Sequence, residues 1–132
     1  MKITADTNVL LRFLLNDDRK QAAAASKALN SASVVAIALP ALCEVVWVLS
    51  QGYKIAASDI ADALEALLDS ENVEVNRGAV DAGLDLLRAG GDFADGVIAF
   101  EGMALGGSIF ISFNKKAISL LKKRGNATRL LT

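Results

Sequence analysis

Histidine is absent from this chain, and cysteine and proline each occur only once among its 132 residues. Without histidine, Ser-His-Asp and Cys-His nucleophile systems, histidine-based zinc sites and imidazole acid–base chemistry are excluded. The single cysteine, Cys43, excludes an internal disulfide and favours an intracellular protein. Chemistry in this chain must therefore use carboxylates, and carboxylate-rich sites select hard cations such as Mg²⁺ or Mn²⁺ over zinc.

Long apolar runs are also missing. No stretch approaches the ~18 consecutive apolar residues that a membrane span requires, and the longest run, residues 34–43, contains Pro40. Asp6 and Arg12 interrupt the start of the chain, which does not read as a signal peptide. We therefore expect a cytoplasmic protein without a membrane segment. Its hydrophobic fraction of 53% exceeds the usual ~45–50% and suggests a surface for a partner.

One carboxylate stands alone in an apolar stretch. Glu44 is the only charged side chain between Lys27 and Lys54, and residues 34–49 around it are otherwise apolar. A carboxylate buried without a partner costs several kcal/mol or takes up a proton. Helix capping and surface solvation explain such a mid-helix glutamate poorly. We therefore expect Glu44 to be buried and to bind a cation or take part in catalysis.

Three aspartates repeat this pattern. Asp6 is the only charge between Lys2 and Arg12 and ends a short strand-like stretch, while Asp92 and Asp95 stand in the segment GGDFADGVIA. Each also has a structural explanation that stays open: Asp6 as a turn or helix-capping residue, and Asp92 with Asp95 as the capping residue and third residue of one helix. Together with the isolated glutamate, these residues suggest an acidic pocket.

The order of elements predicts the fold class. Apolar β-branched runs alternate with segments of helical periodicity, which is typical of an α/β domain with a mostly parallel central sheet. We expect a single three-layer α/β/α domain, residues 1–132, with about five strands and with Ser58 capping a helix. Strands are predicted at residues 2–6, 34–38, 73–75, 108–112 and 128–131, and helices at 8–14, 17–30, 41–51, 59–68, 77–89, 92–105 and 115–123.

The acidic positions fall at related places in this order. Ligands of such sheets bind at the carboxyl ends of the strands. Asp6 follows the first strand and Asn114 follows the fourth. Glu44, Asp92 and Asp95 are expected in the first turns of helices that begin at the same edge. The spacing therefore allows all of them to converge.

Positive charge is concentrated near the end of the chain, although the net charge is only −1. A solvated helix face explains this, because cations are favoured near a helix C-terminus. A surface that contacts phosphates explains it equally well, and both interpretations stay open. No acidic residue follows Glu101, and the basic residues after it are Lys115, Lys116, Lys122, Lys123, Arg124 and Arg129.

Four segments taken together resemble the PIN-domain family, and most closely its VapC-type toxin branch. They follow the order and spacing of the family's motifs over essentially the whole chain. Each segment is a weak indication alone, but the set is specific. The segments are ADTNVL (5–10), LCEV (42–45), GDFADGVIA (91–99) and ISFNKKA (111–117).

The resemblance implies a Mg²⁺- or Mn²⁺-dependent endoribonuclease, the toxin of a type II toxin–antitoxin pair, whose carboxylates hold a metal that activates water against an RNA phosphodiester. It also implies a homodimer and a cognate antitoxin protein. On this chain the metal and catalytic positions are Asp6, Glu44 and Asp95, with Asp92 adjoining. The supporting polar residues are Thr7, Asn8, Ser112 and Asn114, and the candidates for RNA-backbone contact are Lys115, Lys116 and Arg12.

Asn114 departs from the family, which usually has aspartate at this position. An amide oxygen can still bind Mg²⁺ or orient water, but it brings no negative charge, so metal affinity should fall. Ser112 and Asn114 are also explained as a helix cap. A second interpretation is therefore a catalytically silent PIN domain that acts as a binding module. A haloacid-dehalogenase-like phosphohydrolase is disfavoured, because it needs a second aspartate where this chain has Asn8.

Overall fold

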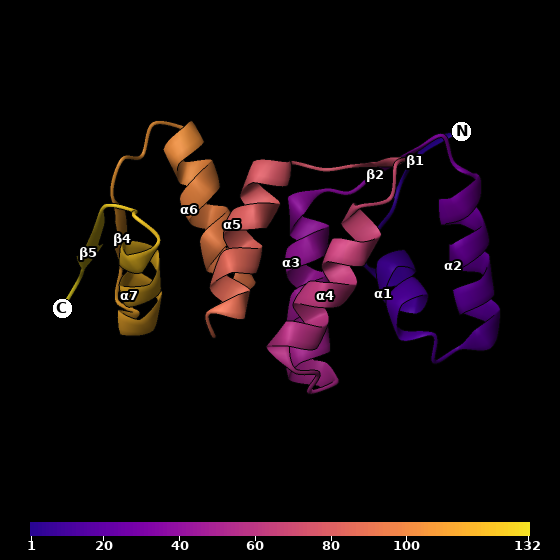
Figure 1. Ribbon diagram of the computed structural model, residues 1–132, viewed down its shortest axis with the longest axis horizontal. Helices are drawn as coiled ribbons and strands as arrows, with labels where there is room; N and C mark the ends of the chain where they lie inside the picture. Colours follow the sequence, from indigo (N-terminus) through magenta and orange to yellow (C-terminus); the bar gives the residue numbers. More distant parts are fainter. The chain divides into compact units, whose positions relative to one another are not determined.

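The computed structural model describes residues 1–132, which form two compact units, Met1–Asn76 and Arg77–Thr132 (Figure 1). Both units alternate short strands with helices. The N-terminal unit contains β1 (Lys2–Thr4), α1 (Thr7–Leu15), α2 (Arg19–Ser31), β2 (Val34–Ala36), α3 (Leu39–Trp47), the π-helical turn η1 (Val48–Gly52), α4 (Ala57–Leu68) and β3 (Val73–Glu74). The C-terminal unit contains α5 (Arg77–Arg88), α6 (Phe93–Ala104), β4 (Phe110–Ser112), α7 (Lys115–Lys123) and β5 (Thr128–Leu130).

The sheet of the N-terminal unit has the order β1-β2-β3, with both pairs parallel. Ile3 is opposite Val35, and Val35 is opposite Val73, so β2 is the central strand. Val35 is buried, as a strand covered on both faces requires. Helix α1 packs against α2 and α3, with Leu10 and Leu42 fully buried. The starts of α1 and α3 therefore lie at the carboxyl edge of two neighbouring strands.

Helix α3 ends in a widened turn. The backbone N–H of Tyr53 donates to the carbonyl of Val48 at 3.1 Å, which is the bond of a π-helical turn. The sequence predicts one continuous helix over residues 41–51, so the structure corrects the form of its last part. Trp47, the last residue of α3, is 65% exposed.

In the C-terminal unit, α5 and α6 cross in close contact. A Cβ on Gly96 of α6 would lie 2.3 Å from the backbone oxygen of Ala82 in α5. A Cβ on Gly83 would lie 2.7 Å from the ring of Phe93, which is fully buried. Only glycine allows the two helix backbones to approach this closely. The segment that carries Asp95 is thereby pressed onto its neighbouring helix.

Strands β4 and β5 form the second sheet, a parallel pair joined by α7. Phe110 is opposite Thr128 in the register of this pair. Phe110 and Leu120 pack on a small core made of one residue each from α5, α6 and α7, namely Leu86, Ala99 and Leu121. The helix α7 is therefore fixed against both the strands and the α5–α6 pair.

The predicted α/β class with parallel strands is confirmed, and five strands are present. They are shorter than predicted and divide into sheets of three and two strands. Ser58 does not cap α4: the helix begins at Ala57, after Ala56, and no side chain makes the capping bond. None of the helices is long and apolar enough to span a bilayer. That residues 1–132 act as a single domain stays a prediction.

Candidate active site

The first acidic position begins α1. Asp6 directly follows the backbone bond from Ala5 N–H to the Ala36 carbonyl at 3.1 Å, which ties the end of β1 to β2. Asp6 Oδ1 accepts a hydrogen bond from the backbone N–H of Val9 at 2.9 Å, so the capping interpretation is confirmed. The side chain is exposed, and its second oxygen stays available to a ligand. Thr7 and Asn8 follow it in the first turn of the same helix.

Glu44 is exposed, which corrects the expectation that it is buried. Helix α3 buries Leu42, Val45 and Val46 and turns Glu44 away from them. It also stands in the second turn of α3, since that helix begins at Leu39. The cost of a buried charge therefore gives no reason for a function here. The remaining structural argument for a role of Glu44 is that its helix, α3, starts at the carboxyl edge of β2.

Asp92 and Asp95 share the first turn of α6. Asp92 Oδ1 accepts a hydrogen bond from the backbone N–H of Ala94 at 3.0 Å, so Asp92 caps the helix as the structural explanation predicted. Asp95 is half-buried, and every other acidic residue of the chain except Glu65 is exposed. Burial, followed by the negative charge of Asp92, raises the pKa of Asp95 above its ordinary value. Asp95 therefore carries an electrostatic cost that no neighbouring cation offsets.

Ser112 and Asn114 link β4 to α7. Ser112 Oγ accepts from the backbone N–H of Asn114 at 2.9 Å, and Asn114 Oδ1 accepts from the backbone N–H of Ala117 at 3.1 Å. The helix-cap explanation of these residues is therefore confirmed. The turn before Asp92 lies against the same helix, because a Cβ on Gly90 would be 3.9 Å from Lys116 Nζ. Within this unit, the starts of α6 and α7 are neighbours.

One known protein family matches this chain. The chain matches the PIN domain family over residues 3–123, from β1 to the end of α7. It belongs to the PIN domain family. PIN domains are three-layer α/β/α folds, are generally nucleases and typically bind divalent metals. No curated protein matches the chain.

The acidic residues of this PIN domain suit a hard cation in their chemistry. The four acidic residues of the predicted site all offer carboxylate oxygens, and none of them forms an ion pair. By contrast, Asp85 and Asp17 each bind an arginine. Neither unit alone gathers three acidic side chains into a group able to hold a metal ion. The convergence of the four therefore stays a prediction. They are Asp6 and Glu44 in the N-terminal unit and Asp92 and Asp95 in the C-terminal unit.

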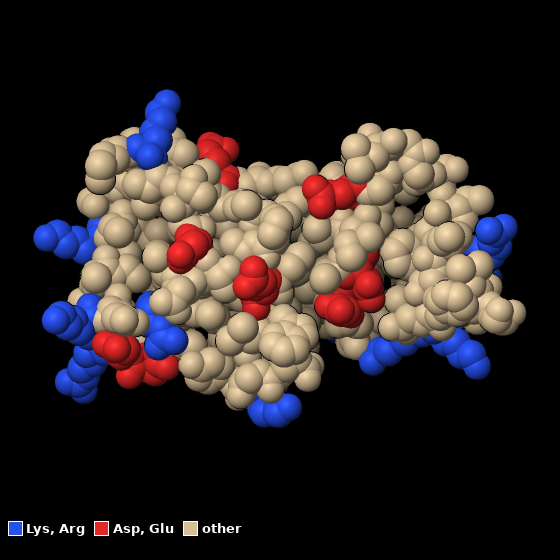
Figure 2. Space-filling view, turned by 180° about the vertical axis from the view of Figure 1, so that it is seen from behind, with Lys and Arg blue, Asp and Glu red and all other residues tan.

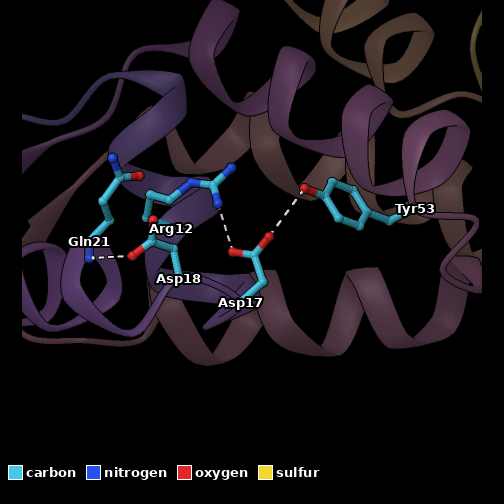
Figure 3. A network of polar contacts seen from close by, with 5 residues as sticks. All are labelled: Arg12, Asp17, Asp18, Gln21 and Tyr53. Atoms are coloured by element: carbon cyan, nitrogen blue, oxygen red, sulfur yellow. Dashed lines mark hydrogen bonds and ion pairs between the residues drawn. The ribbon is translucent and has the colours of Figure 1, made fainter.

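Arg12 has a structural partner that sequence reasoning missed. Its Nη1 forms an ion pair with Asp17 Oδ1 at 2.7 Å, and Asp17 Oδ2 accepts from the hydroxyl of Tyr53 at 3.4 Å (Figure 3). The neighbouring Asp18 caps α2 by accepting from the backbone N–H of Gln21 (Figure 3). Arg12 is only 22% exposed, and its Nε is buried without a partner. This guanidinium holds the link between α1 and α2, so we do not carry it forward as an RNA contact.

Unlike Arg12, most basic residues near the C-terminus have no ion-pair partner. The surface formed by β4, α7 and β5 has basic side chains and no acidic ones (Figure 2). Arg124 Nε forms an ion pair with Asp85 Oδ2 at 2.9 Å. The other basic residues are exposed and have no ion-pair partner: Lys115, Lys116, Lys122, Lys123 and Arg129.

Proposed function

We propose that this PIN domain is an endoribonuclease that depends on Mg²⁺ or Mn²⁺ and hydrolyses RNA phosphodiester bonds. One observation carries the proposal: Asp95 is half-buried beside Asp92, with a raised pKa and no lysine or arginine to neutralise it. A protein does not gain stability from that arrangement, so a bound cation is the simplest reason for it. Asp6 and Glu44 supply further unpaired carboxylates at the matching family positions.

The chemistry follows from the side chains present. A divalent ion held by these carboxylates would supply Lewis-acid chemistry, which lowers the pKa of a bound water molecule and offsets charge that develops on the phosphate. Asp92 and Asp95, which share the start of α6, would hold such an ion through carboxylate oxygen atoms, and that Asp6 and Glu44 join them stays a prediction. No imidazole is present to take a proton, because the chain lacks histidine. Asp6 and Asp92 each use one oxygen to cap a helix, which fixes the direction of the other. Lys116 of α7 lies beside the turn that precedes α6, where a Cβ on Gly90 would be 3.9 Å from its Nζ, and it would contact the RNA backbone.

The proposal includes a toxin–antitoxin role, with a homodimer and a small antitoxin as partners. Its support is the family, which often occurs in such systems, and the apolar surface. Several large apolar side chains are exposed, and a partner protein would cover them. Co-purification from the native host tests this role, and recovery of the protein without any small partner counts against it. These side chains include Trp47, Ile98, Met103, Leu105, Ile109 and Ile111.

Asn114 favours a second candidate, a PIN domain with weakened or lost catalysis that acts as a binding module. Its Oδ1 is engaged in capping α7, and the other end of the amide is an NH₂ group that repels a cation. An aspartate at this position would cap with one oxygen and offer the second to a metal. Asn114 therefore still caps α7, but it lacks the second carboxylate oxygen that an aspartate would offer to a metal.

The test of the main proposal is cleavage of total RNA with Mg²⁺, with Mn²⁺ and with EDTA. Asp6→Asn should abolish cleavage and leave the fold intact, because asparagine caps a helix as well as aspartate does. Asp18→Asn is the matched control, since Asp18 is also exposed and also caps a helix. Equal cleavage by wild type and Asp6→Asn would overturn the proposal. Cleavage that appears only in Asn114→Asp would favour the second candidate.

A further inference from the structure

One exposed aromatic ring, Phe113, lies next to Ser112 and Asn114, two of the polar residues predicted to support the site. Phe113 is 74% exposed, more than Trp47 at 65% or Tyr53 at 45%. It stands between Ser112 and Asn114, and the backbone on both sides of it is held by hydrogen bonds. Leu131 N–H donates to the Ser112 carbonyl at 2.8 Å, and Asn114 N–H donates to Ser112 Oγ at 2.9 Å. The ring is therefore presented on a fixed piece of backbone.

The helix that follows this ring is strongly two-sided. At about 100° per residue, its lysines and one serine fall within one third of the circumference. The opposite side is apolar, with Ala117 and Leu121 buried. No acidic side chain pairs with the lysines of this face. We call it the lysine face of α7, and it comprises Lys115, Lys116, Ser119, Lys122 and Lys123.

We propose that Phe113 is a base-stacking residue for single-stranded RNA and that the lysine face of α7 binds the phosphates on either side of the stacked base. This inference rests on the proposed function and names the form of its substrate. An exposed aromatic ring beside a row of cations is the combination that binds single-stranded nucleic acid, because every base has a face to stack. A duplex keeps its bases stacked inside and has none to offer.

Charge decides between RNA and a protein as the occupant. A solvated helix face explains the lysines but leaves the exposed ring unexplained. An apolar protein partner explains the ring but would have to bury or displace unpaired lysines at a cost. A single strand of RNA satisfies both, since its phosphates neutralise the lysines and its bases cover the ring.

The experiment is fluorescence anisotropy with a labelled single-stranded oligonucleotide made wholly of 2′-O-methyl residues, which cannot be cleaved, in EDTA. Phe113→Ala and Phe113→Leu should weaken binding about tenfold at every salt concentration, because a stacked base contributes roughly 5- to 150-fold. Phe113→Tyr should bind like wild type. Leu105→Ala is the matched control, since Leu105 is 88% exposed in the same unit and lies outside the proposed surface.

The lysines have a separate readout. In the double variant Lys115→Gln with Lys116→Gln, the slope of log affinity against log salt should become less negative by about 1.4. This change corresponds to the loss of two phosphate contacts on a single strand. Phe113→Ala should leave that slope unchanged. Binding of a matched duplex should not depend on Phe113. If Phe113→Leu binds as well as Phe113→Tyr, the contact is not stacking and the inference is overturned.

Measurements of thermal stability and molar mass test whether Phe113 packs against protein instead of RNA. Phe113→Ala should keep the melting temperature of the wild type, and a clear drop would show that the ring packs against protein, which overturns the inference. A change in molar mass on Phe113→Ala with unchanged RNA binding would assign the ring to a protein contact instead. Because no cleavage is measured, binding that depends on Phe113 supports the inference even in a chain without nuclease activity. Binding that does not depend on Phe113 overturns the inference, and the proposed function is then decided separately by the cleavage of total RNA.

Discussion

Asp95 lies one helical turn after Asp92 and is half-buried, and neither carboxylate forms an ion pair. Burial and then the charge of Asp92 raise the pKa of Asp95. Both residues lie in the first turn of α6, where the helix dipole favours negative charge. The dipole and the single capping bond of Asp92 do not remove the cost of the second carboxylate.

Stability should depend on pH through this pair. A carboxyl group whose pKa is raised by folding stabilises the protein when protonated and loses that contribution as pH rises through its folded pKa. In EDTA at neutral pH, Asp95→Asn should therefore be more stable than wild type. The two should converge below about pH 3.9, the ordinary pKa of aspartate. Urea unfolding across this range measures the difference, and a less stable variant at neutral pH would contradict the assignment.

Metal affinity should rise when the family's usual residue is restored at the start of α7. Asn114→Asp keeps the cap on Ala117 and adds one charged oxygen, so Mn²⁺ should bind about tenfold or more tightly, in the range that single changes around a metal site produce. Isothermal calorimetry measures this. Asn30→Asp, which adds the same charge at an exposed position on α2, is the control. Equal gains from both variants would place the metal elsewhere.

The crossing of α5 and α6 should tolerate no added side chain at Gly96. A Cβ there would lie 2.3 Å from the Ala82 backbone oxygen, so the helices must separate, and Gly96→Ala should cost about 1–3 kcal/mol of unfolding free energy. Gly102→Ala in the same helix meets nothing within 4 Å and should stabilise the protein by up to about 1 kcal/mol. Thermal unfolding of the two variants compares them directly. Equal effects would contradict the close approach.

The role of Arg12 is open to a paired test of stability and RNA binding. Arg12→Gln breaks the ion pair and leaves Asp17 with only Tyr53, so it should lower the unfolding free energy. It should leave the salt dependence of RNA binding unchanged. A reduced salt slope would restore Arg12 as an RNA contact.

Local signals in the sequence were enough to place most helices. Asp6, Asp92 and Asn114 each cap the helix that follows, and a cap bonds only to backbone two or three residues away. Helix α7 has the bounds that were predicted, because its lysines and apolar residues alternate with clear helical period. The strands are shorter than predicted, because pairing with a distant segment decides where a strand ends.

Side-chain environments were harder to predict. Glu44 lies among apolar residues in sequence, yet a helix carries consecutive residues to different sides, and Val45 and Val46 are buried while Glu44 is not. The contact of Arg12 with Asp17, and of Asp17 with Tyr53, joins segments that share no sequence pattern. Only the folded chain shows these relationships.

The exposed Trp47 at the end of α3 gives this protein a spectroscopic reporter of its own. It is the only tryptophan in the chain, so all indole emission comes from one place. Glu44 precedes it by three residues on the same helix, and side chains with that spacing are neighbours on a helix surface. Because Mn²⁺ is paramagnetic and quenches nearby emission, an ion held at Glu44 would dim the only indole, with no label attached.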